Sequence, residues 1–130
     1  MGFCMSIDID RDFDETVAAA RAALADNGFG VLTEIDLKAT LKAKLDVDIP
    51  PQTILGACRP PLAYAAIQAD PSIAVFLPCN VVVRSLSAGR TQVEAMDPGY
   101  MVEVSGQAEL GPIAADARER IGRALEQLAG

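Results

Sequence analysis

Two cysteines and one arginine are the residues of this sequence whose types and spacing could support chemistry. Cys58 and Arg59 come directly before two prolines that open an expected helix, and Cys79 begins an expected strand further along the chain. The positive end of a helix and a neighbouring arginine both lower the pKa of a thiol and attract anions. If the cysteines converge, they could form a reversible dithiol or hold a soft metal. The alternative is that each is a small buried apolar residue.

We therefore take Cys58, Arg59, Cys79 and Asn80 as a candidate ligand or thiol site, in which Arg59 and nearby helix N–H groups would hold an anion. The alternative for Arg59 is a surface arginine. Asp36 is a fifth candidate, because a carboxylate beside a sheet could serve an enzyme as acid or base. Nothing beyond its position supports that enzymatic reading.

Several classes of site are excluded by what the sequence lacks. It contains no histidine, which removes serine–histidine and cysteine–histidine catalysis and every histidine-ligated metal site. The acids that alternate from Asp8 to Asp14 lack the glycine and glutamate of a calcium loop, since Phe13 and Ala19 stand at those positions. No phosphate-binding loop precedes a helix. We expect no metal and no cofactor, and the sequence leans away from an enzyme.

The net charge and the number of cysteines limit which binding partners and which cellular compartment we expect. Eleven basic residues against 18 acidic residues give a formal net charge of −7. That charge repels phosphate backbones and anionic lipids, so we expect neither nucleic-acid nor membrane binding. Three cysteines are no disulfide framework and fit a reducing cytoplasm.

Periodicity and helix-stop signals give the elements that must position these residues. Asp12 and Asp36 have the pattern of helix N-caps. Strands are expected near 2–8, 29–35, 53–57, 81–87 and 91–95, and helices near 12–27, after Asp36, near 61–69, near 98–104 and from 111 onwards.

These elements predict a single compact α+β domain spanning residues 1–130, with half of its residues (51%) hydrophobic. About five strands would form a mixed sheet covered by amphipathic helices. The sheet is expected to be mixed because a tight turn joins the last two strands, whereas helices join the earlier ones.

Two runs of the sequence resemble a known family. Residues 54–63 (ILGACRPPLA) and 76–83 (FLPCNVVV) resemble the domain of unknown function 302 family, and the likeness extends over nearly the whole chain. It implies a small bacterial or archaeal α/β protein that forms homodimers. Some members resemble neighbours of sulfur-metabolism proteins, which favours a thiol role. Members usually carry asparagine where this chain has Arg59, whose side chain cannot cap a helix.

Two functions follow from the residues and the resemblance. The first is a dimeric cytoplasmic module that binds a small anionic or sulfur-containing ligand through Cys58, Arg59 and Cys79. The second is a non-catalytic structural or protein-interaction module.

Overall fold

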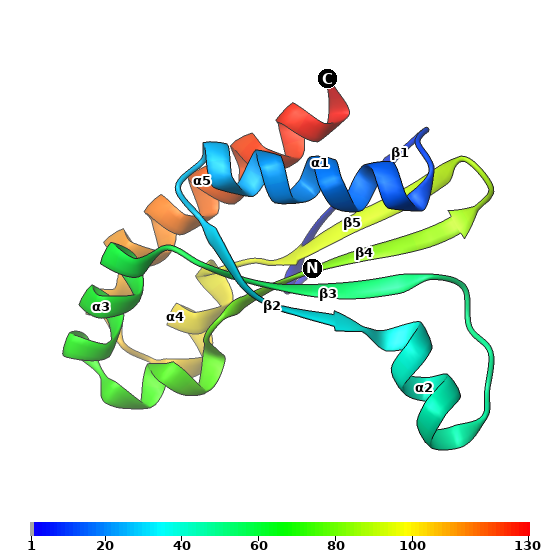
Figure 1. The fold of residues 1–130 in the computed structure, drawn as a ribbon. Helices are drawn as coiled ribbons and strands as arrows, with labels where there is room; N and C mark the ends of the chain where they lie inside the picture. The colour runs from blue at the N-terminus through cyan, green and yellow to red at the C-terminus, as the bar shows by residue number, and fades with distance from the viewer. Residues whose placement is uncertain (1) are drawn as a thin grey trace.

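The structure, a computed structural model, describes residues 2–130 as five strands, five α-helices and two short 3-10 helices (Figure 1). In chain order they are β1 (Cys4–Ile9), α1 (Phe13–Asp26), β2 (Gly30–Asp36), α2 (Leu37–Leu45), β3 (Gln52–Cys58), α3 (Pro60–Ala69), η1 (Pro71–Phe76), β4 (Cys79–Ser87), β5 (Arg90–Met96), α4 (Gly99–Ser105), η2 (Ala108–Leu110) and α5 (Gly111–Ala129). Within residues 2–130, no helix is long and apolar enough to cross a membrane.

The five strands form one sheet in the order β1-β5-β4-β3-β2. Every neighbouring pair is antiparallel. The predicted single α+β domain with five strands is confirmed, but the expectation of a mixed sheet is wrong in its pairing. Helices in a connection produce parallel neighbours only when they carry the chain back to the starting end of the sheet.

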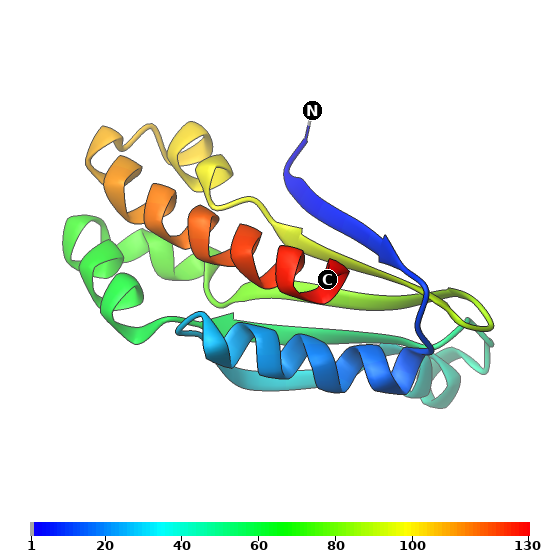
Figure 2. The ribbon, with the colours of Figure 1, turned by 90° about the horizontal axis from the view of Figure 1, so that it is seen from above.

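The connections explain the pairing. The segment α3–η1 leaves the end of β3 and returns to the sheet at that same end, so β4 runs antiparallel to β3. Helix α1 does cross the sheet, but it carries the chain from one edge strand, β1, to the other, β2, so these two strands do not pair (Figure 2).

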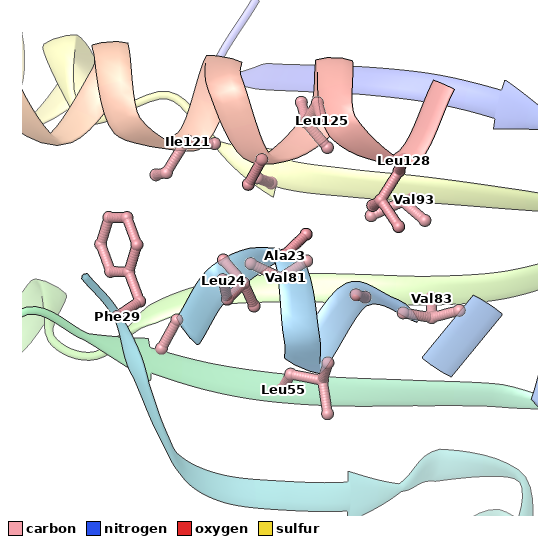
Figure 3. Packing of buried hydrophobic residues seen from close by; sticks show 14 residues of the cluster. Ala23, Leu24, Phe29, Leu55, Val81, Val83, Val93, Ile121, Leu125 and Leu128 are labelled. Atoms are coloured by element: carbon pink, nitrogen blue, oxygen red, sulfur yellow. The ribbon is translucent and has the colours of Figure 1, made fainter. Parts of the chain in front are cut away.

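Burial is one-sided. Helices α1 and α5 lie side by side over one face of the sheet, as Figures 1 and 2 show. The main core fills the space between them and the strands (Figure 3). Its largest fully buried members include Leu55, Val83, Val93 and Ile121. Because successive strand residues point to opposite faces, the alternate residues of the same strands form a second face that α1 and α5 do not cover.

A smaller cluster packs at one end of the sheet, where α3, η1 and α4 gather (Figure 2). It is built on Ala66, Ile73, Met101 and Leu110. At the opposite end, α2 follows β2. The Asp36 carboxylate caps α2 by accepting the Ala39 N–H at 2.9 Å, as the sequence predicts.

Gly56 is the position of β3 where a side chain cannot fit. A Cβ there would overlap Thr33 Oγ1 and lie 2.8 Å from Pro78 Cγ. We expect Gly56→Ala to lower the free energy of unfolding by about 1–3 kcal/mol in urea denaturation, because it overpacks the β2–β3–β4 contact. Gly122→Ala is the control: its Cβ would meet only Met5 Cε at 3.7 Å in the middle of α5. That change should stabilise the helix by up to about 1 kcal/mol. Equal effects of both changes would contradict this account.

Candidate functional site

The pairing of β3 with β4 brings the two predicted cysteines to one pocket. Ala57 lies directly opposite Cys79 in the antiparallel register, and Cys58 is the last residue of β3. Both cysteines line a pocket between the end of the sheet, α3 and α5. Its other walls are Phe29, Ala57, Arg59, Leu62, Ala63, Ala66, Leu77, Met101, Ile113 and Ala117. The structure therefore brings both cysteines to one pocket, where Cys58 influences the thiol of Cys79.

The pocket is small and almost entirely apolar. Its cavity volume is about 30 Å³, room for a single water-sized or methyl-sized group. Leu62 and Met101 contribute apolar walls, and Arg59 is the one charged residue among the lining side chains. The pocket thus combines room for one methyl-sized apolar group with a single positive charge in its lining.

The thiol of Cys79 is poorly suited to nucleophilic chemistry. The residue is buried, and burial raises the pKa of its thiol from the ordinary 9.0 to about 11, with a further contribution from the neighbouring Cys58. Cys58 is half-buried, and neither residue is in a disulfide. Because of this raised pKa, the Cys79 thiol is protonated at neutral pH and forms an apolar part of the pocket wall. Only the thiolate is strongly nucleophilic, so the thiol is unreactive there.

The N-terminus of α3 does not supply the anion-binding amides that the sequence suggests. Residues 60 and 61 are prolines, which carry no N–H group. The next two N–H groups, of Leu62 and Ala63, both donate to the Arg59 carbonyl at 3.0 Å. An anion at this helix must therefore be held by side chains, and Arg59 stands at the N-cap position of the helix.

The Arg59 guanidinium lies partly inside the protein without a full set of partners. Its side chain is 24% exposed. Among residues 2–130, its Nε is the one buried side-chain nitrogen or oxygen with no hydrogen-bond partner. The nearest carboxylate oxygen, Asp116 Oδ2, is 3.9 Å from that Nε, too far for a hydrogen bond. Leaving such a donor unpaired costs about 1–3 kcal/mol.

A second arginine joins this site, and sequence reasoning missed it. On α5, Arg120 Nε lies 3.2 Å from Asp116 Oδ1, and its Nη1 donates to the Asn27 carbonyl at 3.3 Å. Its i,i+4 spacing from Asp116 is visible in the sequence. Nothing in the sequence links this pair to Arg59, which lies on another element.

Two of the predicted site residues lie elsewhere. Asn80 follows Cys79 on β4, so its side chain points to the opposite face of the sheet, where it is exposed. Asp36 pairs with Thr53, five residues along β3 from Cys58, a separation of roughly 17 Å. Its carboxylate serves as the cap of α2. Neither residue lines the pocket.

We expect iodoacetamide at pH 8 to modify Cys79 of the folded protein much more slowly than Cys79 of the urea-unfolded protein. A pKa of about 11 instead of 9.0 lowers the thiolate fraction by about 100-fold, and burial slows access further. The modification rate should keep rising as the pH approaches 11. Peptide mass spectrometry gives each cysteine its own rate. Equal rates in folded and unfolded protein at pH 8 would contradict this description of Cys79.

The raised pKa also predicts a pH dependence of stability. Between pH 9 and 11 the unfolded chain releases the Cys79 proton and the folded chain keeps it, so the free energy of unfolding should fall as pH rises through this window. Urea denaturation of the wild type and of Cys79→Ala at pH 8 and 10.5 measures the effect. The decline that belongs to Cys79 should be absent in the variant.

Comparison with known proteins places this architecture. A comparison with curated protein sequences found no match. The crystal structure of an uncharacterized conserved protein DUF302 from Bacillus stearothermophilus is similar to this structure, with a TM-score of 0.90 and 28% sequence identity over 98% of this chain and 99% of that chain. The family model described as "Domain of unknown function DUF302" matches residues 5–128. Since this match spans nearly the whole chain, the chain belongs to the DUF302 family.

Proposed function

We propose that this protein is a binding module for a small anionic ligand, with the charged group of the ligand at Arg59 and a short apolar tail in the pocket of Cys58 and Cys79. The observation that carries the proposal is the buried, unpartnered Nε of Arg59 beside an apolar pocket. A buried donor with no acceptor is a local loss of stability. An anionic ligand would supply the missing acceptor.

The composition of the pocket favours binding over thiol catalysis. Cys79 is protonated near neutral pH, because burial raises its pKa to about 11. The cavity of about 30 Å³ admits one methyl-sized group, such as the terminal methyl of an ethyl tail, or one sulfur atom. An anion with a sulfur atom in its tail therefore fits as well as one with a hydrocarbon tail. The three cysteines are all free, which is consistent with a reducing cytoplasm.

The test is Arg59→Met, which keeps the apolar stem and removes the charge. Calorimetric titration with ethanesulfonate should show binding to the wild type and a loss of about tenfold or more in the variant, because a charge-assisted hydrogen bond is removed. The free energy of unfolding should stay the same or rise, because the change deletes an unpaired buried donor. In the wild type, ethanesulfonate should also slow iodoacetamide modification of Cys58.

Arg123→Met is the matched control, since Arg123 is exposed on α5 and pairs with Glu119. It removes the same charge from the protein and should leave ethanesulfonate binding unchanged. If Arg59→Met instead lowers the free energy of unfolding by more than about 1 kcal/mol and leaves binding intact, Arg59 supports the fold and the proposal fails.

A second candidate function is self-association through the sheet face opposite α1 and α5, here called the open face. Its residues follow from the register as three cross-strand rows: Gln52–Arg84–Gln92–Asp8, Ile35–Ile54–Val82–Glu94–Ser6, and Thr33–Gly56–Asn80–Met96–Cys4. The middle row places three β-branched apolar residues side by side. Ile35 is exposed, and Ile54 and Val82 are half-buried; a row of accessible apolar side chains of this kind marks an interaction surface.

The charge of the open face favours a second copy of this chain as its partner. Each chain carries −7, so two copies repel each other at most surfaces. On the open face Arg84 lies 3.2 Å from Glu94 and donates to Gln52 Oε1 at 3.3 Å. Asp8 lies 3.6 Å from Arg90, so each charged residue of the face has a partner of opposite charge. Five strands about 4.8 Å apart and about six residues long give the sheet a planar area of roughly 500 Å². The accessible surface is larger than this planar area, because side chains project from it. Even the planar area is a large part of the roughly 800 Å² per partner found in stable interfaces.

We expect Ile54→Lys to convert a homodimer into a monomer in sedimentation velocity measurements, because it places a lysine in the middle of the open face. Val75→Lys is the control, since Val75 on η1 is 84% exposed and lies outside the open face. It adds the same charge and should leave the dimer intact. A wild-type protein that sediments as a monomer at tens of micromolar would overturn this candidate function.

A further inference from the structure

We infer that the charged group of the ligand is a doubly charged oxyanion, such as a phosphoryl group, free or esterified, held between Arg59 and Arg120. For the part that Arg59 plays, this rests on the proposed function. It adds a second binding residue from α5 and narrows the ligand to one class of anion.

The two guanidinium groups converge on one point above Gly28. A Cβ built on Gly28 would lie 2.7 Å from Arg59 Nη1 and 3.2 Å from Arg120 Nη1. The two nitrogens can therefore be no further apart than the sum of these distances. An oxyanion with several oxygens can accept hydrogen bonds from two arginines at this spacing, as planar guanidinium groups do with phosphates.

The charge count at this point distinguishes Arg59 and Arg120 from the other arginines that have carboxylate partners. Arg59 and Arg120 share a single carboxylate, that of Asp116. Five other arginines each pair with carboxylates that they do not share with a second arginine: Arg21, Arg84, Arg90, Arg118 and Arg123. The cluster of Arg59, Arg120 and Asp116 thus keeps a net positive charge in a protein of formal charge −7. Both arginine side chains are about a quarter exposed, 24% and 27%, where Coulomb attraction is stronger than in open water.

The two arginines have different roles in this arrangement. Arg120 is held from two sides, by Asp116 on its own helix and by the Asn27 carbonyl after α1. Such support fixes its position before a ligand arrives. Arg59 has the unpartnered Nε and provides the unused donor. A dianion bound between them is attracted by each guanidinium group about twice as strongly as a monoanion, and one of its two charges offsets the single positive charge that Asp116 leaves uncompensated.

Gly28 keeps the meeting point open. Its φ of +90° is a left-handed conformation that favours glycine, and it lets α1 end here. The same residue leaves room for both guanidinium groups, because any side chain would press against Arg59 Nη1. One glycine therefore satisfies a backbone requirement and a binding requirement.

The experiment compares two probes that share an ethyl tail and differ in charge. Ethyl phosphate is a dianion at pH 8, and ethanesulfonate is a monoanion. In calorimetric titrations at constant ionic strength, the wild type should bind ethyl phosphate about tenfold more tightly or better, because two arginines share the dianion. Arg120→Gln should weaken the binding of ethyl phosphate much more than the binding of ethanesulfonate, and so remove most of this preference. Arg123→Gln, which removes the same charge from α5, should preserve the preference.

The wild type alone provides a second readout in case Arg120→Gln does not fold. Affinity for ethyl phosphate should fall as pH drops through about 6, where a phosphate monoester takes up its second proton. Affinity for ethanesulfonate should not follow this curve. If ethyl phosphate affinity is flat across this range, or if both probes bind equally well and depend on Arg59 alone, the dianion inference is overturned and the proposed pocket stands.

The remaining outcomes separate the two proposals. If inorganic phosphate binds as tightly as ethyl phosphate and depends on Arg120, the arginine pair is supported and the apolar pocket is not. If neither ethyl phosphate nor ethanesulfonate binds, both proposals fail.

Discussion

The antiparallel pairing of β3 with β4 is the interaction on which the candidate site depends. It sets Ala57 opposite Cys79 and so places Cys58 at the same end of the sheet. The same pairing requires α3 and η1 to leave and rejoin the sheet at that end, and this puts Arg59 at the edge of the pocket. Gly56 permits the close approach of Thr33 and Pro78 that this pairing entails. Without this register, the cysteines and the arginine would be remote residues of a 130-residue chain.

In the proposed binding site, the two arginines would keep a local loss of stability at the place where a ligand binds. A buried guanidinium nitrogen without an acceptor opposes folding, and two arginines on one carboxylate repel each other. The rest of the fold offsets this loss through the core under α1 and α5. A ligand that supplies the missing negative charge would recover what the empty arrangement lacks. Cys79 adds no charge to this site, because burial raises the pKa of its thiol and keeps the thiol uncharged.

One-sided covering of the sheet separates the two proposed functions in space. The pocket lies among the helices at one end of the sheet, and the open face lies on the other side. Adjacent residues of one strand therefore belong to different surfaces: Cys79 lines the pocket and Asn80 faces outward. Ligand binding and self-association can coexist, because neither uses the surface of the other.

Local patterns in the sequence predicted the elements and several of their ends. Asp12 and Asp36 accept from the backbone N–H groups of Glu15 and Ala39 as expected of caps, because capping depends on residues within one turn. Apolar spacing likewise indicated which side of each helix is buried. The sequence allowed Cys58 and Cys79 to meet, since one helical connection separates them, and it left open whether they are buried; the structure places both at one pocket and buries Cys79. Asp36 does not line the pocket. Its carboxylate instead caps α2 by accepting a hydrogen bond from the Ala39 N–H group.

Strand order and the arginine cluster depended on tertiary structure. Helical connections are compatible with parallel or antiparallel neighbours, and only packing of the whole chain decided that every pair is antiparallel. Arg59 meets Asp116 and Arg120 because α5 packs beside the end of β3, a contact between segments far apart in the chain. The sequence by itself determined where helices and strands begin and which residues could bind an anion, because those properties are local. Which of these residues meet was decided by long-range packing, since no local pattern encodes a distance between remote segments.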